Sequence, residues 1–322
     1  MRAAVCPAYG PPGVVRVEDR PVPAIGAGQV RVRVGAAAVN FPDVLLIADA
    51  YQISVPPPFV PGSEFAGEIV ETGPGVEGLR VGDRVAGAVL HGAFAEEIVV
   101  PAAGLSVVPA GVDDRTAAAF GVAFRTAHHT LRSVARVSEG DDVVVLGAGG
   151  GVGLAAVALA AQLGATVTAV ASSEEKLAAA TRCGARHQVN HRDGDLRGAL
   201  KRALPAGAHA VVDPVGGALS EPALRSLRRG GRFVTVGFAS GAIPAIPLNL
   251  VLVKGVQIMG FQFADVPPDE FARNEAELTA LLADGRVRPH IGAVYALADV
   301  TAALTQVAEG RAIGKVVVDL TR

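Results

Sequence analysis

The stretch VVVLGAGGGVG, Val143 to Gly153, passes without a break from four apolar, strand-forming residues into a turn that holds five glycines. Glycine lets the backbone turn sharply and come close to a neighbour that a side chain would keep away. Ala148, Gly150 and Gly153 occupy the three positions of the G-x-G-x-x-G pattern, with alanine in the first. Because small apolar residues follow, from Leu154 to Leu163, the stretch predicts a strand, a tight turn and a helix.

The turn has the features of a phosphate site. Backbone N–H groups at the start of a helix, together with its dipole, favour a phosphate, and the small residues would let a pyrophosphate come close. A Walker-type loop is excluded because it ends in Gly-Lys-Ser/Thr, whereas Leu154 follows Gly153. The alternative is a tight turn without a ligand. Since the strand, the helix and a further strand complete a βαβ unit, we interpret the turn as the site of a dinucleotide pyrophosphate.

The end of the next strand, VTAVASSEEK, indicates which dinucleotide is bound. An NAD site usually carries Asp or Glu here, about 20 residues after the glycine turn, to hold the ribose 2′-hydroxyl. No acid stands from Val170 to Ser173, and Ser172 and Lys176 stand where a 2′-phosphate would lie. Ser172 and Glu175 also match the S-x-x-E capping box of a helix, and both interpretations stay open. The pattern favours NADPH over NADH.

The sequence changes its character near residue 120. Before it, short strands alternate with Gly and Pro, and QVRVRVGAAAVN alternates valine with polar residues, which predicts a small, partly open barrel or sandwich. After it, apolar runs such as DVVVLG, TVTAVA and GRFVTVG alternate with helical stretches, which predicts a parallel sheet covered on both faces. Beyond about 265, a helix leads to a last strand, KVVVDL, in a tail that could return to the first domain.

Length and composition exclude several classes of protein. With 322 residues the chain is long enough for two hydrophobic cores, and its net charge of -2 gives no sign of a nucleic-acid partner. Two cysteines are too few for a disulfide framework or a four-cysteine zinc site. The N-terminus lacks the apolar core of a signal peptide, and no run reaches the roughly 18 apolar residues that span a bilayer. We expect a soluble, cytoplasmic protein with a small-molecule substrate and neither a nucleic-acid nor a membrane partner.

Several segments together resemble the medium-chain dehydrogenase/reductase superfamily, in its zinc-free quinone oxidoreductase (zeta-crystallin-like) branch. They are NFPDVL (40–45), PPPFVPGSEFAGEIVETGPGV (56–76), VGDRV (81–85), GAGGGVGLAAV (147–157), DPVGG (213–217) and VGFASG (236–241). The resemblance covers nearly the whole chain and implies an α/β protein. A doubly wound Rossmann domain, residues 121–263, would be inserted in a GroES-like, mainly β substrate domain, residues 1–120 and 264–322.

The positions that hold zinc in other members of the superfamily carry different residues here. Zinc-dependent relatives have a metal-binding Cys early in the first domain and a His before the Glu of a PG-H-E segment. In this chain Asn40 falls near the first position and Ser63 replaces the second. The histidines show no ligand spacing, because His128 and His129 are adjacent on a predicted helix and so point in different directions. We therefore expect no metal.

The resemblance also implies cofactor contacts, residue by residue. The pyrophosphate would meet Gly150, Gly151 and Val152. The ribose phosphate would meet Ser172 and Lys176, with Arg311 of GRAIGK as a further basic residue. His191, followed by Arg192, stands where relatives have a Tyr-Arg pair near the adenine. The nicotinamide half would be lined by Thr126, Val215, Phe238, Ala239 and Phe261. For Phe238 and Phe261, plain core packing is the alternative.

The expected chemistry is hydride transfer from NADPH to a quinone or an activated enone. Negative charge builds on the substrate oxygen, so a group must hydrogen-bond or protonate it. The candidates are Asn40, an amide donor, and Tyr51, which stands where zinc-free enoyl reductases place a functional tyrosine. The alternative for Tyr51 is packing in its Pro-rich loop.

Two other functions stay open, namely reduction of enoyl thioesters such as enoyl-CoA, and NADPH binding for sensing or structure with little turnover. The resemblance further implies a homodimer. VQIMGF is apolar and is predicted to lie toward the edge of the sheet, where a second copy would cover it.

Overall fold

The computed structural model describes all 322 residues, and the chain divides into two compact units. Unit 1 comprises Met1–Val122 and Ile291–Arg322, and unit 2 comprises Ala123–His290. None of the helices combines the length and the apolar character that crossing a bilayer requires.

Unit 1 is built on a seven-stranded sheet in the order β14-β15-β3-β4-β5-β7, with β6 also paired to β3. Its strands are β3 (Gln29–Val39), β4 (Glu64–Thr72), β5 (Arg84–Ala88), β6 (Glu97–Pro101), β7 (Leu105–Val107), β14 (Ile291–Ala296) and β15 (Lys315–Asp319). A separate antiparallel pair is formed by β1 (Arg2–Val5) and β2 (Arg16–Asp19). The valines that alternate along β3 all point into the core. The tail does return, because β15 pairs antiparallel with β3.

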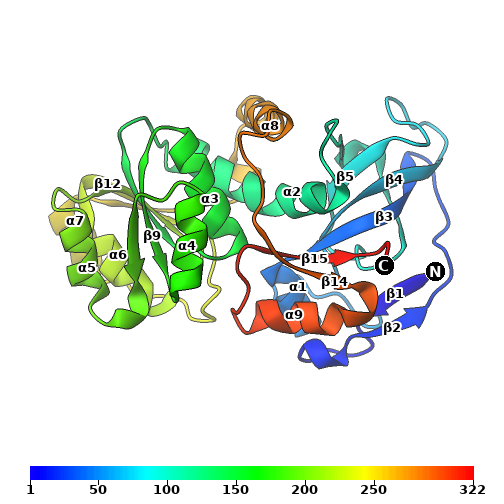
Figure 1. The fold of residues 1–322 in the computed structure, drawn as a ribbon, viewed down its shortest axis with the longest axis horizontal. Coiled ribbons are helices and arrows are strands. Elements are labelled where there is room, and N and C mark those ends of the chain that lie inside the picture. The colour runs from blue at the N-terminus through cyan, green and yellow to red at the C-terminus, as the bar shows by residue number, and fades with distance from the viewer. The chain divides into compact units, whose positions relative to one another are not determined.

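Short helices complete unit 1. The first half of α2 (Asp114–His129) belongs to it, as do α1 (Phe41–Ile47) and α9 (Val300–Ala308). Helix α9 packs on α1 and on β14 and β15, as Figure 1 shows. The core between them and the sheet is filled by large side chains such as Phe65, Ile69 and Leu304.

Unit 2 contains a six-stranded parallel sheet in the order β10-β9-β8-β11-β12-β13. Its strands are β8 (Asp142–Leu146), β9 (Thr166–Ala171), β10 (His187–Asn190), β11 (Ala208–Asp213), β12 (Leu227–Thr235) and β13 (Gln257–Gly260). Numbered one to six along the chain, they lie in the order 3-2-1-4-5-6 of a Rossmann domain. The predicted α/β fold class is confirmed.

Helices cover both faces of this sheet. They are α3 (Gly151–Gln162), α4 (Glu174–Arg182), α5 (Leu196–Ala203), α6 (Ser220–Arg225) and α7 (Leu248–Lys254). Helices α3 and α4 pack side by side, and so do α5 and α6 (Figure 1). Val143 to Leu146 of β8 are fully buried, as expected for a strand that is covered on both sides.

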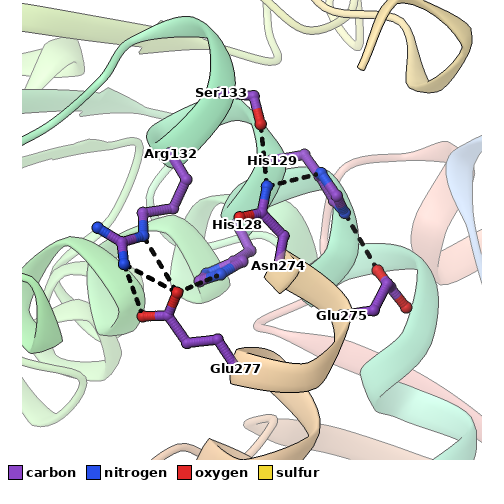
Figure 2. Close-up of polar contacts among 7 residues, drawn as sticks. All are labelled: His128, His129, Arg132, Ser133, Asn274, Glu275 and Glu277. Carbon is purple, nitrogen blue, oxygen red and sulfur yellow. Dashed lines mark hydrogen bonds and ion pairs between the residues drawn. The ribbon is translucent and has the colours of Figure 1, made fainter. Parts of the chain in front are cut away.

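The second boundary of the inserted unit lies at 290/291 rather than at 263/264, where the sequence placed it. Helix α8 (Pro268–Ala283) belongs to unit 2 because its polar side chains bind the end of α2 (Figure 2). The Asn274 amide contacts His129 Nδ1 at 3.1 Å and Ser133 Oγ at 2.9 Å. Glu277 pairs with Arg132 at 2.9 Å.

The two adjacent histidines on α2 are part of this packing. Both are buried, and their rings lie at 83° to each other. His129 stacks on Phe271 with 4.7 Å between ring centroids and reaches Glu275 Oε1 with Nε2 at 3.1 Å. Burial lowers the pKa of His128, against the effect of the nearby Glu277 carboxylate. Both histidines therefore pack in the interior of unit 2.

Candidate functional site

In the glycine turn after β8, a side-chain Cβ would fit at Gly150 but not at Gly153. Gly147 has a φ of +59°, and Gly150 donates its N–H to Gly147 O at 2.9 Å. A Cβ on Gly153 would lie only 2.1 Å from Gly147 O, so that only glycine lets α3 sit so close to the turn. A Cβ on Gly150 would find its nearest atom at 3.5 Å. Gly153 therefore serves the packing of the fold, whereas Gly150 keeps the outer side of the turn open.

Helix α3 begins at Gly151, directly behind this turn. The N–H groups of Gly151 and Val152, in the first helical turn, have no acceptor within the helix, and the helix dipole adds positive potential there. These two residues and Gly150 thus have the geometry expected for an anion site. The predicted pyrophosphate contacts remain a proposal.

A second turn lies against the first. The Val215 side chain packs on Gly147, since a Cβ there would lie 2.6 Å from Val215 Cγ2. This DPVGG turn is held by Asp213, whose buried Oδ1 accepts the N–H groups of Val215 and Gly216 at 2.8 Å each. Asp213 Oδ2 accepts the Ser220 hydroxyl at 2.6 Å. The DPVGG motif is visible in the sequence, but no local pattern predicts that its aspartate holds the turn.

In the first turn of α4, Lys176 lies across the glycine turn. A Cβ on Gly149 would lie 2.5 Å from Lys176 Cβ, so the stem of the lysine rests on the turn. Lys176 Nζ is 3.5 Å from Ser172 Oγ. The N-cap of α4 is Ser173, whose side chain accepts the Lys176 N–H at 3.4 Å. The capping box predicted from Ser172 and Glu175 is therefore wrong, because the cap lies one residue later. Ser172 is consequently not the helix cap, and its hydroxyl lies with the lysine head group.

Positive charge gathers at this corner of unit 2. Burial lowers the pKa of Lys176, and the charge of Arg192 lowers it further. Burial also lowers the pKa of His191, with Arg192 and Lys176 acting in the same direction. Because these neighbours repel one another's protons, an anion bound among them would relieve the repulsion. Arg192 and His191 directly follow β10, Ser172 directly follows β9, and Lys176 lies in the first turn of α4.

The residues predicted to line the nicotinamide differ in exposure. Phe238 is 40% exposed, and Ala239 donates its N–H to Pro214 O at 3.1 Å. Phe261 is buried, and its ring packs edge to face on Phe263 with 4.8 Å between ring centroids. This is the packing that the core alternative for Phe261 describes. Thr126 is half-buried on α2.

Arg311, the further basic residue predicted for the ribose phosphate, belongs to unit 1. It is exposed there and pairs with Glu309 at 2.5 Å. The Arg311 side chain therefore forms an ion pair with a carboxylate of its own unit.

Unit 1 contains a buried network of five polar side chains, which are Asn40, Asp43, Ser63, Glu64 and Lys315. Lys315 Nζ donates to Asn40 Oδ1 at 2.6 Å and to Glu64 Oε2 at 3.1 Å. Asn40 Nδ2 donates to Glu64 Oε2 at 3.2 Å and to Ser63 Oγ at 3.3 Å. Asn40 is thus fully engaged and only 8% exposed.

Asp43 is the least satisfied member of the buried network. Its Oδ2 accepts the Asn40 N–H at 2.7 Å, while its buried Oδ1 has no hydrogen-bond partner. Burial raises the pKa of Asp43 to about 7. Sequence reasoning missed Asp43 and Lys315, although NFPDVL and GRAIGK were quoted, because no local pattern brings position 315 beside position 40.

Tyr51 is half-buried and packs against the hydrophobic core of unit 1. Its predicted catalytic role stays a prediction. The two positions that correspond to zinc ligands in relatives, Asn40 and Ser63, lie together in the buried network. No three His, Cys, Asp or Glu side chains in the molecule are grouped so as to hold a metal ion.

Known proteins resemble both units. Residues 26–110 match the family described as alcohol dehydrogenase GroES-like domain, and residues 151–280 match the family described as zinc-binding dehydrogenase. Quinone oxidoreductase-like protein 2 of Bos taurus is 38% identical over 99% of this chain and 92% of its own length.

Solved structures agree over the whole chain. An NAD-dependent alcohol dehydrogenase is 32% identical, with a TM-score of 0.92 over 99% of this chain and 100% of its own. The quinone oxidoreductase of Escherichia coli, complexed with NADPH, is 25% identical with a TM-score of 0.90 over 99% and 100%. The full-length relationship, the two matched domain families and the fold of each unit show that the chain belongs to the medium-chain dehydrogenase/reductase superfamily, in its zinc-free quinone oxidoreductase branch.

Proposed function

We propose that the protein is an NADPH-dependent reductase that delivers hydride to quinones or activated enones. The observation that carries the proposal is the corner of Ser172, Lys176 and Arg192 beside the glycine turn, at a strand end without an acid. The Escherichia coli relative, complexed with NADPH, supports this choice. Since a similar fold also occurs in an NAD-dependent relative, the residues of the corner rather than the fold carry the preference.

NADPH, when bound, would supply the hydride. In unit 2, the N–H groups of Gly151 and Val152 would hold the pyrophosphate, Lys176 the 2′-phosphate and His191 the adenine side. Phe238, exposed at the turn after β12, would border the nicotinamide. In unit 1, Tyr51 is the group proposed to hydrogen-bond the substrate oxygen, because the Asn40 amide already donates to Ser63 and Glu64 inside the buried network. Lys315 holds the Asn40 carbonyl oxygen, so the orientation of the amide is fixed.

The test is an acceptor screen with NADPH, followed by absorbance at the nicotinamide band. We expect oxidation of NADPH with a simple quinone and with an enone. Preferred turnover of an enoyl thioester would assign the alternative reductase function. Saturable NADPH binding without turnover of any acceptor would instead assign a sensing or structural role.

Replacing Lys176 by alanine should raise KM for NADPH while leaving KM for NADH little changed. A charge-assisted hydrogen bond to a phosphate contributes about 1.5–3 kcal/mol, which corresponds to roughly 10- to 150-fold in affinity. The measurement is steady-state kinetics with both cofactors. Lys201→Ala, which removes an exposed lysine from α5 of the same unit, is the matched control. Equal affinity of the unmodified protein for both cofactors would contradict the NADPH preference.

We also propose a homodimer formed through the edge of the parallel sheet. Strand β13 is the last strand of that sheet, and its Ile258 is 41% exposed. The preceding helix α7 exposes 77% of Leu248 and 82% of Leu252. An unpaired edge beside exposed apolar side chains favours pairing with a second copy.

Ile258→Lys should shift the protein from dimer to monomer in sedimentation velocity, with a loss of at least about tenfold in dimer affinity. A lysine at the edge places charge where the partner strand would lie. Ile53→Lys, at an exposed isoleucine of unit 1, should leave the dimer intact. A monomeric unmodified protein would refute the proposed interface.

A further inference from the structure

The turn after β11 is held from inside by a carboxylate that accepts three hydrogen bonds. Asp213, the last residue of β11, and Ser220, the first residue of α6, are both fully buried. Asp213 Oδ1 accepts the N–H groups of Val215 and Gly216, and Oδ2 accepts the Ser220 hydroxyl. The serine thus orients the carboxylate, and the carboxylate fixes the backbone of the turn. Because both side chains are buried, any effect that they have on a ligand must pass through the turn.

This turn is also joined to the loop that follows β12. Ser240 donates its N–H to Val215 O at 2.9 Å, and Gly217 donates its N–H to a carbonyl oxygen of that loop at 2.9 Å. Phe238 packs over Gly216, where a Cβ would lie 2.8 Å from Phe238 Cδ1. With these N–H groups used inside the protein, the turn offers a ligand apolar side chains, those of Val215 and Phe238, rather than hydrogen-bond donors.

The topology of the sheet gives this turn its place relative to a dinucleotide. Strands β8 and β11 are neighbours, and the strand order reverses between them. Ligands of such sheets bind outside the carboxyl ends of the strands at this reversal. The glycine turn follows β8, and Val215 of the turn after β11 packs on its Gly147. Lys176 lies on the other side of β8, in the helix after β9. If Lys176 binds the ribose phosphate, the turn after β11 therefore faces the nicotinamide half.

We propose that Asp213 and Ser220 are positioning residues for the nicotinamide half of NADPH, a role that rests on the proposed function. Their hydrogen bonds fix the turn after β11, and the turn holds Val215 and Phe238 as an apolar wall beside the nicotinamide ring. Neither Asp213 nor Ser220 touches the cofactor. The adenosine half depends on Lys176 and the glycine turn instead, so the two halves of the cofactor can be tested separately.

The test measures the binding of two ligands to the unmodified protein and to Ser220→Ala by isothermal titration calorimetry. NADPH contains both halves, whereas adenosine 2′,5′-bisphosphate contains only the phosphate-bearing adenosine half. Ser220→Ala should raise the Kd for NADPH about tenfold, because Asp213 Oδ2 loses its donor and the turn is no longer held in place. The Kd for the bisphosphate should change by less than about twofold, since its site shares no partner with Ser220.

Ser226→Ala is the matched control. Ser226 directly follows α6, the helix that Ser220 begins, and its hydroxyl donates to Ala223 O at the same distance of 2.6 Å. Because this hydrogen bond does not reach the turn, both Kd values should stay unchanged. Asp213→Asn should keep most of the NADPH affinity, since its carbonyl oxygen can still accept the two backbone N–H groups and its amide can donate to Ser220. Unchanged NADPH affinity in Ser220→Ala, or equal weakening of both ligands, overturns the positioning role.

Hydrogen exchange gives a second readout that needs no variant. In the unmodified protein NADPH should slow the exchange of the backbone N–H groups of residues 215–217, and adenosine 2′,5′-bisphosphate should not. Equal protection of this turn by both ligands would contradict its place beside the nicotinamide half, while leaving the proposed NADPH preference intact. An unmodified protein that binds neither ligand would contradict the proposed function, and the role of Asp213 and Ser220 with it.

Discussion

Replacing Lys315 by methionine should lower the free energy of unfolding of unit 1 by about 3–5 kcal/mol, the usual cost of removing one partner from a buried ion pair. The Lys315 side chain is 5% exposed, and that of Glu64, its partner at 3.1 Å, is 2% exposed. Methionine fills a similar volume but leaves the Glu64 carboxylate without a cation. It also leaves the Asn40 carbonyl oxygen without its donor at 2.6 Å.

The chain offers a selective probe for this experiment. It has no tryptophan, and its three tyrosines, Tyr9, Tyr51 and Tyr295, all belong to unit 1. Tyrosine fluorescence in a urea titration therefore reports the unfolding of this unit. The double variant Lys315→Met with Glu64→Gln should recover part of the loss, because it removes the unpaired charge. If the single and double variants unfold alike, Glu64 is not the group that Lys315 stabilises.

The second large effect is expected at the glycine turn, where replacing Gly153 or Gly150 by alanine should affect stability and cofactor binding differently. Gly153→Ala should lower the free energy of unfolding of unit 2 by about 1–3 kcal/mol or more, because its Cβ would meet Gly147 O at 2.1 Å and α3 would have to move. Gly150→Ala should leave stability nearly unchanged, since its φ is -89° and its Cβ has 3.5 Å of clearance. Both variants should weaken NADPH binding, Gly150→Ala by roughly tenfold or more, because its Cβ would hold the pyrophosphate away from the N–H groups of Gly151 and Val152 and so weaken about one charge-assisted hydrogen bond.

Far-UV circular dichroism during thermal unfolding, together with cofactor titration, separates the two effects. The expected pattern is a cofactor defect with normal stability for Gly150→Ala and a defect in both for Gly153→Ala. Normal NADPH affinity in Gly150→Ala would show that the outer side of the turn does not face the pyrophosphate, and the proposed cofactor site would then be wrong.

Local sequence patterns predicted most of the fold because they arise from short-range physics. The run from Val143 to Gly153 predicts a buried strand, a tight turn and a helix, and the structure has β8, the turn and α3 there. Alternation of valine and polar residues predicts the buried face of β3, and all three valines are buried. The position of VQIMGF toward the sheet edge is confirmed by β13.

The sequence-based predictions were wrong at the N-cap of α4, where two local patterns compete, and at α8, a helix that is polar on several sides. Two adjacent serines precede α4, and only the end of β9 at Ala171 and the start of the helix at Glu174 make Ser173 the cap. Helix α8 was assigned to the first domain because its sequence does not say what it packs on. Its asparagine and glutamates bind His129, Ser133 and Arg132, more than 100 positions earlier in the chain.

The sequence by itself determined the βαβ unit, the glycines that its turn needs and the missing acid after β9. Each of these depends on residues close together in the chain, where backbone sterics and hydrogen bonding act directly. Only the tertiary structure decided that Lys315 of β15 meets Asn40 and Glu64, and that Asp43 is left without a cation. Which charges share a buried space depends on how β15 pairs with β3, and a lysine's sequence neighbours do not encode the carboxylate that it will meet across a sheet.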